Sequence, residues 1–134
     1  MLIKLSANNK FHIYFTKVLI FLLLLISSVS CGKINYQYSQ EKSGTLVEIA
    51  ISPYPQKSLT PTKYTIHVTH NGHPIEEDVK VTFQMKEMEM GDDLTASSKG
   101  NGNYEVNENL DMPGTWDIII NVSSEKFTFE TTAQ

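Results

Sequence analysis

The chain has 134 residues, of which 11 are basic and 15 acidic, with a formal net charge of −4 and a single cysteine. Every basic residue is a lysine and every acidic residue follows Cys31, so the C-terminal part is strongly acidic. Nucleic-acid binding is not expected, because neutralising phosphates requires clustered cations. One cysteine also excludes an internal disulfide framework and a Cys-based structural zinc site.

Residues 1–30 have the pattern of a secretory signal peptide. Three lysines, the last of them Lys17, precede an apolar run from Val18 to Ile26, and a serine-rich stretch follows. A charged stretch, a short apolar core and a small-residue site are typical of export signals. Because a membrane-spanning helix needs ~20 apolar residues, we expect this segment to direct export rather than to remain as an anchor.

Cys31 follows this segment directly, and Ser28-Val29-Ser30-Cys31 resembles a lipobox, the lipidation signal of bacterial lipoproteins. In that case Cys31 becomes the mature N-terminus, and two acyl chains give stable membrane attachment. The alternative is a secreted protein with an incidental cysteine near its cleavage site. Residues 31–44 are therefore expected to begin with a lipidated N-terminus. The rest of this segment is polar and lacks hydrophobic periodicity, which predicts a flexible tether. The expected localisation is the extracytoplasmic face of the cell membrane.

Residues 45–134 alternate between apolar and polar side chains, as half-buried β-strands do. Asn71-Gly72 and residues 100–103 predict tight turns, because Asn and Gly tolerate positive φ. Short strands separated by such turns predict an all-β fold, a sandwich of two antiparallel sheets. The inward faces are expected to hold Tyr64, Ile66, Val68, Val79, Val81, Phe83, Tyr104, Trp116, Ile118 and Ile120.

No catalytic motif stands out in the domain. The sequence has no glycine-rich phosphate loop, no Ser-His-Asp arrangement on a strained turn and no His-Glu-x-x-His pattern. Without a recognisable pair of base and nucleophile, a hydrolase has no basis in the sequence. We therefore expect a protein that is not an enzyme and has no catalytic residues.

Methionines are concentrated in one segment, at Met85, Met88 and Met90, and Met112 precedes Pro113-Gly114-Thr115-Trp116. Thioethers are soft, uncharged ligands that select Cu(I) over hard and borderline cations. Met88 and Met90 are two residues apart and would point to one side of an extended segment, whereas Met85 has the opposite parity. The alternative is packing alone, because Met85 continues an apolar strand face and methionine fills irregular gaps.

Three histidines, His67, His70 and His73, surround a predicted turn. Imidazoles suit Cu(II) or Zn(II), and a hairpin would bring His73 near His70, whereas His67 has the opposite parity. The alternative is that all three are solvated residues at a hairpin tip. The acidic residues 76–78 and 92–93 lack the spacing of a calcium loop and are expected to be solvated.

Four short patterns occur in order between residues 45 and 132. They are Tyr64-x-Ile66-x-Val68, the Met-rich segment 85–90, Gly102-x-Tyr104 and Met112-Pro113-Gly114-x-Trp116. In this order they resemble the YtkA-like family of small exported bacterial domains, which is related in sequence style to FixH. The resemblance implies an immunoglobulin-like sandwich at the outer face of the membrane, with a role in copper handling that is often discussed with cytochrome oxidase assembly. Carried over by position, the implied metal ligands are Met85, Met88, Met90 and Met112.

These observations together predict a membrane-tethered extracytoplasmic copper-binding protein, a Cu(I) carrier or chaperone presenting Met88 and Met90 at its tip. A loop at the end of a stiff sandwich suits a carrier, because an exposed ion can be released to a partner, here a copper-accepting membrane protein. The alternative is a metal-free protein-interaction module of a membrane-associated complex, in which exposed methionines form an adaptable apolar patch.

Overall fold

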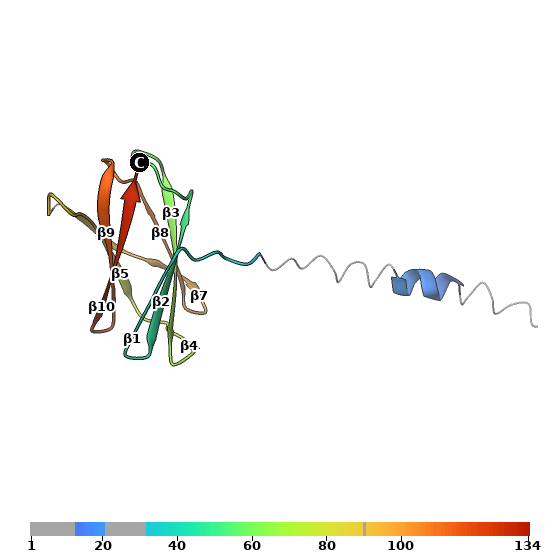
Figure 1. The fold of residues 1–134 in the computed structure, drawn as a ribbon. Helices are drawn as coiled ribbons and strands as arrows, with labels where there is room; N and C mark the ends of the chain where they lie inside the picture. Colours follow the sequence, from blue (N-terminus) through green and yellow to red (C-terminus); the bar gives the residue numbers. More distant parts are fainter. Residues whose placement is uncertain (1–12, 21–31, 90) are drawn as a thin grey trace, which may run out of the picture. The chain divides into compact units, whose positions relative to one another are not determined.

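The computed structural model describes residues 13–20, 32–89 and 91–134. The chain divides into two units, residues 1–33 and 34–134, and all strands belong to the second (Figure 1). In the first unit a helix covers residues 13–20, and no helix within the described ranges is long and apolar enough to cross a bilayer. Cys31 and most of the predicted signal peptide lie outside the described residues, so export and lipidation stay predictions.

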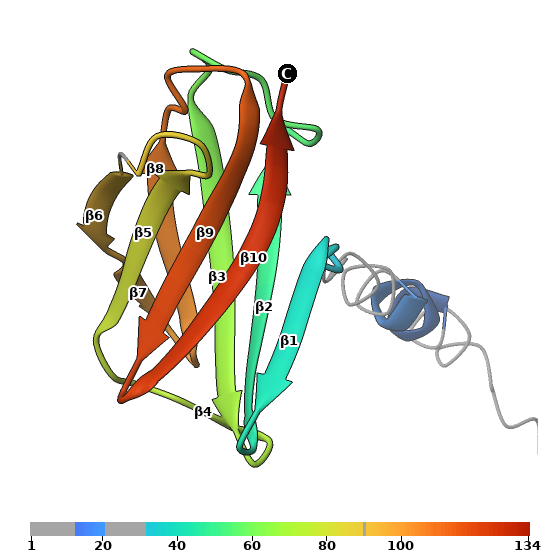
Figure 2. The ribbon, with the colours of Figure 1, turned by 60° about the vertical axis from the view of Figure 1, so that its left-hand side comes forward.

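The second unit is a sandwich of two antiparallel β-sheets (Figures 1 and 2). One sheet has the order β1-β2-β3-β8-β7, with β4 paired to β3, and the other has the order β10-β9-β5-β6. This architecture confirms the all-β antiparallel sandwich predicted from the sequence. The strands are β1 (Tyr38–Lys42), β2 (Thr45–Ser52), β3 (Thr62–His70), β4 (His73–Pro74), β5 (Val79–Met85), β6 (Gly91–Thr95), β7 (Ser97–Gly100), β8 (Asn103–Glu108), β9 (Gly114–Val122) and β10 (Glu125–Ala133).

The core lies between the sheets and follows from the alternation of side chains along each strand. All ten residues predicted to face inward are buried, and Val47, Ile49 and Ile51 of β2 join them. Tyr64 of β3 and Phe83 of β5 bring the sheets into contact, with ring centroids 4.7 Å apart. Such aromatic contacts add to the hydrophobic gain of burying both rings.

Strand β1 lies within residues 31–44, which the sequence predicted to be a flexible tether. That prediction is corrected for the end of the segment, because β1 pairs with β2 and is part of the sandwich. Tyr38 donates its hydroxyl to Thr131 Oγ1 at 3.0 Å, and Lys42 Nζ donates to the carbonyl of Lys126 at 2.8 Å. Both acceptors lie on β10, so β1 joins the edges of the two sheets. The strand is mostly exposed and polar, which is why the sequence showed no hydrophobic period there.

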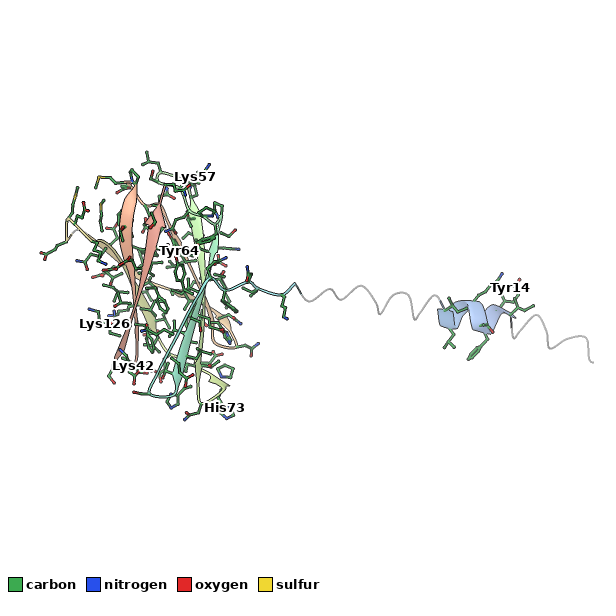
Figure 3. All side chains as sticks on the ribbon, viewed as in Figure 1. Tyr14, Lys42, Lys57, Tyr64, His73 and Lys126 are labelled. Carbon is green, nitrogen blue, oxygen red and sulfur yellow. The ribbon has the colours of Figure 1, made fainter. Side chains whose placement is uncertain are left out.

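The loops gather at two opposite ends of the sandwich (Figure 2). The β5–β6 and β8–β9 loops and the C-terminus lie at one end, here called the thioether end. The β3–β4 and β9–β10 turns lie at the other, here called the histidine end. Lys57, in the β2–β3 loop, and His73 mark the two ends in Figure 3. The predicted turn at Asn71-Gly72 is confirmed at the histidine end, with φ values of 49° and 80°.

Candidate metal-binding site

Two of the four methionines predicted as ligands line one small cavity at the thioether end. Met85 is the last residue of β5, whereas Met112 lies in the β8–β9 loop. The fold therefore brings together two thioethers that are distant in the sequence. The cavity has a volume of about 150 Å³ and is lined by Met85, Gly91, Asp92, Asp111, Met112 and Trp116.

Register within the second sheet fixes the position of Met85. It has the same parity as Phe83, faces inward and pairs with Trp116 of β9. The pairing continues one residue further, where the amide of Lys86 donates to the carbonyl of Thr115 at 3.1 Å. Only 7% of Met85 is exposed, so its thioether lies at the rim of the core rather than on the surface.

A hydrogen bond holds Met112 beside the indole of Trp116. Trp116 Nε1 donates to the backbone carbonyl of Met112 at 3.0 Å, which fixes the β8–β9 loop against the ring. Met112 is partly buried and packs against the core. The buried indole therefore forms a wall of the same cavity that both methionines line.

Gly114 leaves the space that the Met85 methyl group occupies. Its φ is 140°, in a region that L residues with side chains rarely adopt. A Cβ atom built there would lie 2.9 Å from Met85 Cε. Glycine at this position therefore permits both the strained backbone at the start of β9 and the close approach of the thioether.

The β5–β6 loop carries the other two predicted ligands. Met88 is 48% exposed and is not among the residues that line the cavity. Its amide donates to the carbonyl of Met85 at 3.3 Å, in the turn that follows β5. Met90 lies outside the described residues. The hypothesis that Met88 and Met90 meet at the tip therefore stays a prediction.

Negative charge surrounds the cavity mouth. Asp92 and Asp111 line it and are exposed, and Glu87 and Glu89 are exposed on the adjoining loop. Lys86, on the same loop, is paired with Glu130, whose hydrogen bond and charge raise the pKa of the lysine amine. The acidic side chains raise the local concentration of cations. Neither Asp111 nor the contribution of Trp116 to the cavity was predicted from the sequence, although Asp111 directly precedes Met112 and Trp116 lies one short turn after it.

The three histidines divide between two faces of the first sheet. His67 faces outward, with Nδ1 3.0 Å from Asn103 Oδ1. His70 and His73 pair directly across the turn, as the sequence predicted, and line a cavity at the histidine end. Within the described ranges, no three His, Cys, Asp or Glu side chains already stand together as a metal-binding group.

Comparison with protein families matches the YtkA-like profile to residues 40–121, from β1 into β9. The chain belongs to the YtkA-like family. The matched range contains all four methionines predicted as ligands, together with Gly114 and Trp116. A comparison with curated proteins gives no significant match.

Proposed function

We propose that this YtkA-like domain binds Cu(I) in the cavity lined by Met85 and Met112 and carries the ion at the outer face of the membrane. The observation that carries the proposal is the convergence of two thioethers, from β5 and the β8–β9 loop, on one cavity. Thioethers are soft ligands that select Cu(I) over harder cations. Tethering through lipidated Cys31 keeps the carrier beside a copper-accepting membrane protein, for example during cytochrome oxidase assembly.

The remaining walls of the cavity favour a cation. The aromatic face of Trp116 can attract a cation electrostatically, an interaction that strengthens as water is excluded. Asp92 and Asp111 add negative potential at the mouth but are hard donors, so they attract the ion without competing for its soft coordination. A site with two soft ligands and an open mouth is suited to loading and release.

Exposed loops beside the cavity suit transfer to a partner. Met88, half-exposed on the β5–β6 loop, offers a further thioether at the surface. Loops on a rigid scaffold are where proteins place groups that must meet a partner. In this arrangement the cavity holds the ion, and Met88 on the adjoining loop can meet a partner.

Competitive titration with a chromophoric Cu(I) chelator under reducing conditions tests the proposal on the full chain in detergent. The Met85→Leu/Met112→Leu variant removes both cavity thioethers while conserving volume, which costs less than about 1.5 kcal/mol of stability per site. We expect its Cu(I) affinity to fall at least tenfold. Met88→Leu/Met90→Leu, which also removes two thioethers, is the matched control and should lose less.

The two double variants separate the possible outcomes. A greater loss in Met88→Leu/Met90→Leu places the ion on the loop tip and contradicts the cavity assignment. Unchanged affinity in both variants excludes methionine-based copper binding.

A metal-free interaction module is the second candidate, and exposed apolar side chains at the same end favour it. Tyr54 and Leu59, in the β2–β3 loop, are exposed, as is Met88. The amide of Leu59 donates to the carbonyl of Leu110 at 2.8 Å, which holds this loop against the β8–β9 loop. Melting curves distinguish the two functions, because Cu(I) raises the melting temperature only of a protein whose folded state binds it.

A further inference from the structure

A second cavity, of about 570 Å³, opens between the sheets at the histidine end. Its walls come from both sheets and from the segment that joins β4 to β5. The side chains that matter for its chemistry are those of Thr45, His70, His73, Glu76, Glu77 and Glu125. The cavity is therefore rich in imidazole and carboxylate groups, in contrast to the thioether cavity at the other end.

His70 occupies the inward face of β3. Ile66 and Val68 of the same parity are buried in the core, and His70 is the next residue on that face, where the core ends. Its Nδ1 lies 2.9 Å from the hydroxyl of Thr45, a side chain that is only 6% exposed. Metal-binding imidazoles are commonly oriented by such a hydrogen bond at the second ring nitrogen. In His70 this bond leaves Nε2 for a ligand.

His73 lies directly opposite His70 across the β3–β4 turn. Directly opposed residues in an antiparallel pair have Cβ atoms ~4.5–5.5 Å apart and point to the same face. Asn71 and Gly72 form the tight turn that fixes this register. The pairing therefore places the two histidines next to each other. Imidazole pairs suit borderline divalent ions such as Cu²⁺ and Zn²⁺.

Glu125 adds a carboxylate to the lining of this cavity. Its Oε2 is buried and has no hydrogen-bond partner among the described residues. Glu77, by contrast, accepts a hydrogen bond from the hydroxyl of Ser123, and Glu76 accepts one from the amide of Asn101 at 2.9 Å. Of the three carboxylates in the lining, Glu125 is the one with an oxygen for which the described residues supply no donor.

We propose that the cavity at the histidine end binds a divalent transition-metal ion through His70 and His73, with the Glu125 carboxylate as the third ligand. Three such groups do not yet stand at ligand distances in the described residues, so binding draws the carboxylate towards the imidazole pair. Water completes the coordination. The site is independent of the thioether cavity and takes ions of a different class.

Cu²⁺, the strongest-binding divalent ion of the first row, is the probe for this site. The full chain in detergent is titrated by calorimetry, and the bound ion is examined by electron paramagnetic resonance. His12 lies in the predicted signal peptide, and every protein in the series carries His12→Asn so that only the three domain histidines remain even where that peptide is retained. We expect one Cu²⁺ per chain, with splitting from two imidazole nitrogens.

Variants then assign the ligands. His70→Asn and His73→Asn should each lower the Cu²⁺ affinity at least tenfold, and both residues are exposed, so the fold is retained. His67→Asn is the matched control, because it removes an imidazole on the opposite face of the sheet, and it should leave the affinity unchanged. Thr45→Val keeps the buried volume, removes the hydroxyl that orients His70 and should weaken binding by about 10–100-fold.

Glu125→Gln tests the carboxylate separately. It should weaken Cu²⁺ binding while leaving the metal-free protein no less stable, because glutamine keeps the size of this partly buried side chain and removes only its charge. Equal losses in His67→Asn and His70→Asn, or a spectrum without imidazole nitrogen, would overturn the proposal. Those outcomes do not affect the Cu(I) titrations of the methionine variants. Failure of this proposal can therefore be distinguished from failure of the proposed copper carrier.

Discussion

Replacing Gly114 with alanine links backbone strain to the thioether cavity. The φ of 140° is one that L side chains rarely adopt, and holding alanine there costs about 1–3 kcal/mol. The added Cβ would also lie 2.9 Å from Met85 Cε, and the flexible thioether moves more easily than the backbone. We therefore expect Gly114→Ala to lower stability and to displace the Met85 thioether from the cavity.

Thermal denaturation and Cu(I) titration measure the two effects. A loss of 1 kcal/mol lowers the melting temperature by about 4–8 °C for a domain of this size. Cu(I) affinity should fall at least fivefold, which corresponds to about 1 kcal/mol. Gly100→Ala is the matched control, since φ is 84° at Gly100 and no atom lies within 4 Å of the added Cβ. It should lose stability through strain and keep its Cu(I) affinity.

Three outcomes of the measurements on Gly114→Ala and Gly100→Ala would contradict this prediction. If Gly114→Ala melts at the parent temperature, the strain assigned to this position is wrong. If it melts lower but binds Cu(I) as tightly as the parent, Met85 does not contribute its thioether to the site. If Gly100→Ala loses affinity equally, the loss reflects general destabilisation instead of the Met85 contact.

Three further predictions concern Tyr64, Lys86 and Trp116. Burial raises the pKa of Tyr64, because it disfavours the ionised hydroxyl in the folded state. The stabilisation that follows is complete below about pH 10, and above that pH the free energy of unfolding falls by up to ~1.4 kcal/mol per pH unit. Tyr64→Phe should flatten this alkaline slope in urea denaturation, yet cost about 1–3 kcal/mol at neutral pH, because the buried Oε1 of Gln56 loses its donor. Lys86→Ala should leave the urea midpoint unchanged, because its pair with Glu130 is exposed. Trp116 is the sole tryptophan, so Cu(I) should change the protein's tryptophan emission whereas Zn²⁺ should not.

Side-chain alternation explains why the architecture could be predicted. Runs such as Trp116, Ile118 and Ile120 require one strand face to be buried, and the turn at Asn71-Gly72 requires the positive φ that is found. Strand β1 escaped prediction because polar side chains fill it and backbone pairing with β2, together with contacts to β10, holds it in place. Short edge strands of this kind carry little hydrophobic signal.

The methionines of the candidate site could be selected from the sequence, but the cavity that Met85 and Met112 line could not. Clustering in sequence directed attention to Met88 and Met90, whereas the cavity joins Met85 to Met112 through the pairing of β5 with β9. That register is a long-range property, which no local spacing reveals. The pairing of His70 with His73 could be anticipated, because a two-residue turn separates them and fixes their register.

X-ray absorption at the copper edge tests the central claim most directly, because it identifies the atoms bound to the ion. The Cu(I)-loaded parent should show thioether sulfur in the first coordination shell, and that sulfur signal should disappear in the Met85→Leu/Met112→Leu variant. A first shell of nitrogen and oxygen alone in the parent, or a sulfur signal that persists in this variant, would contradict the account.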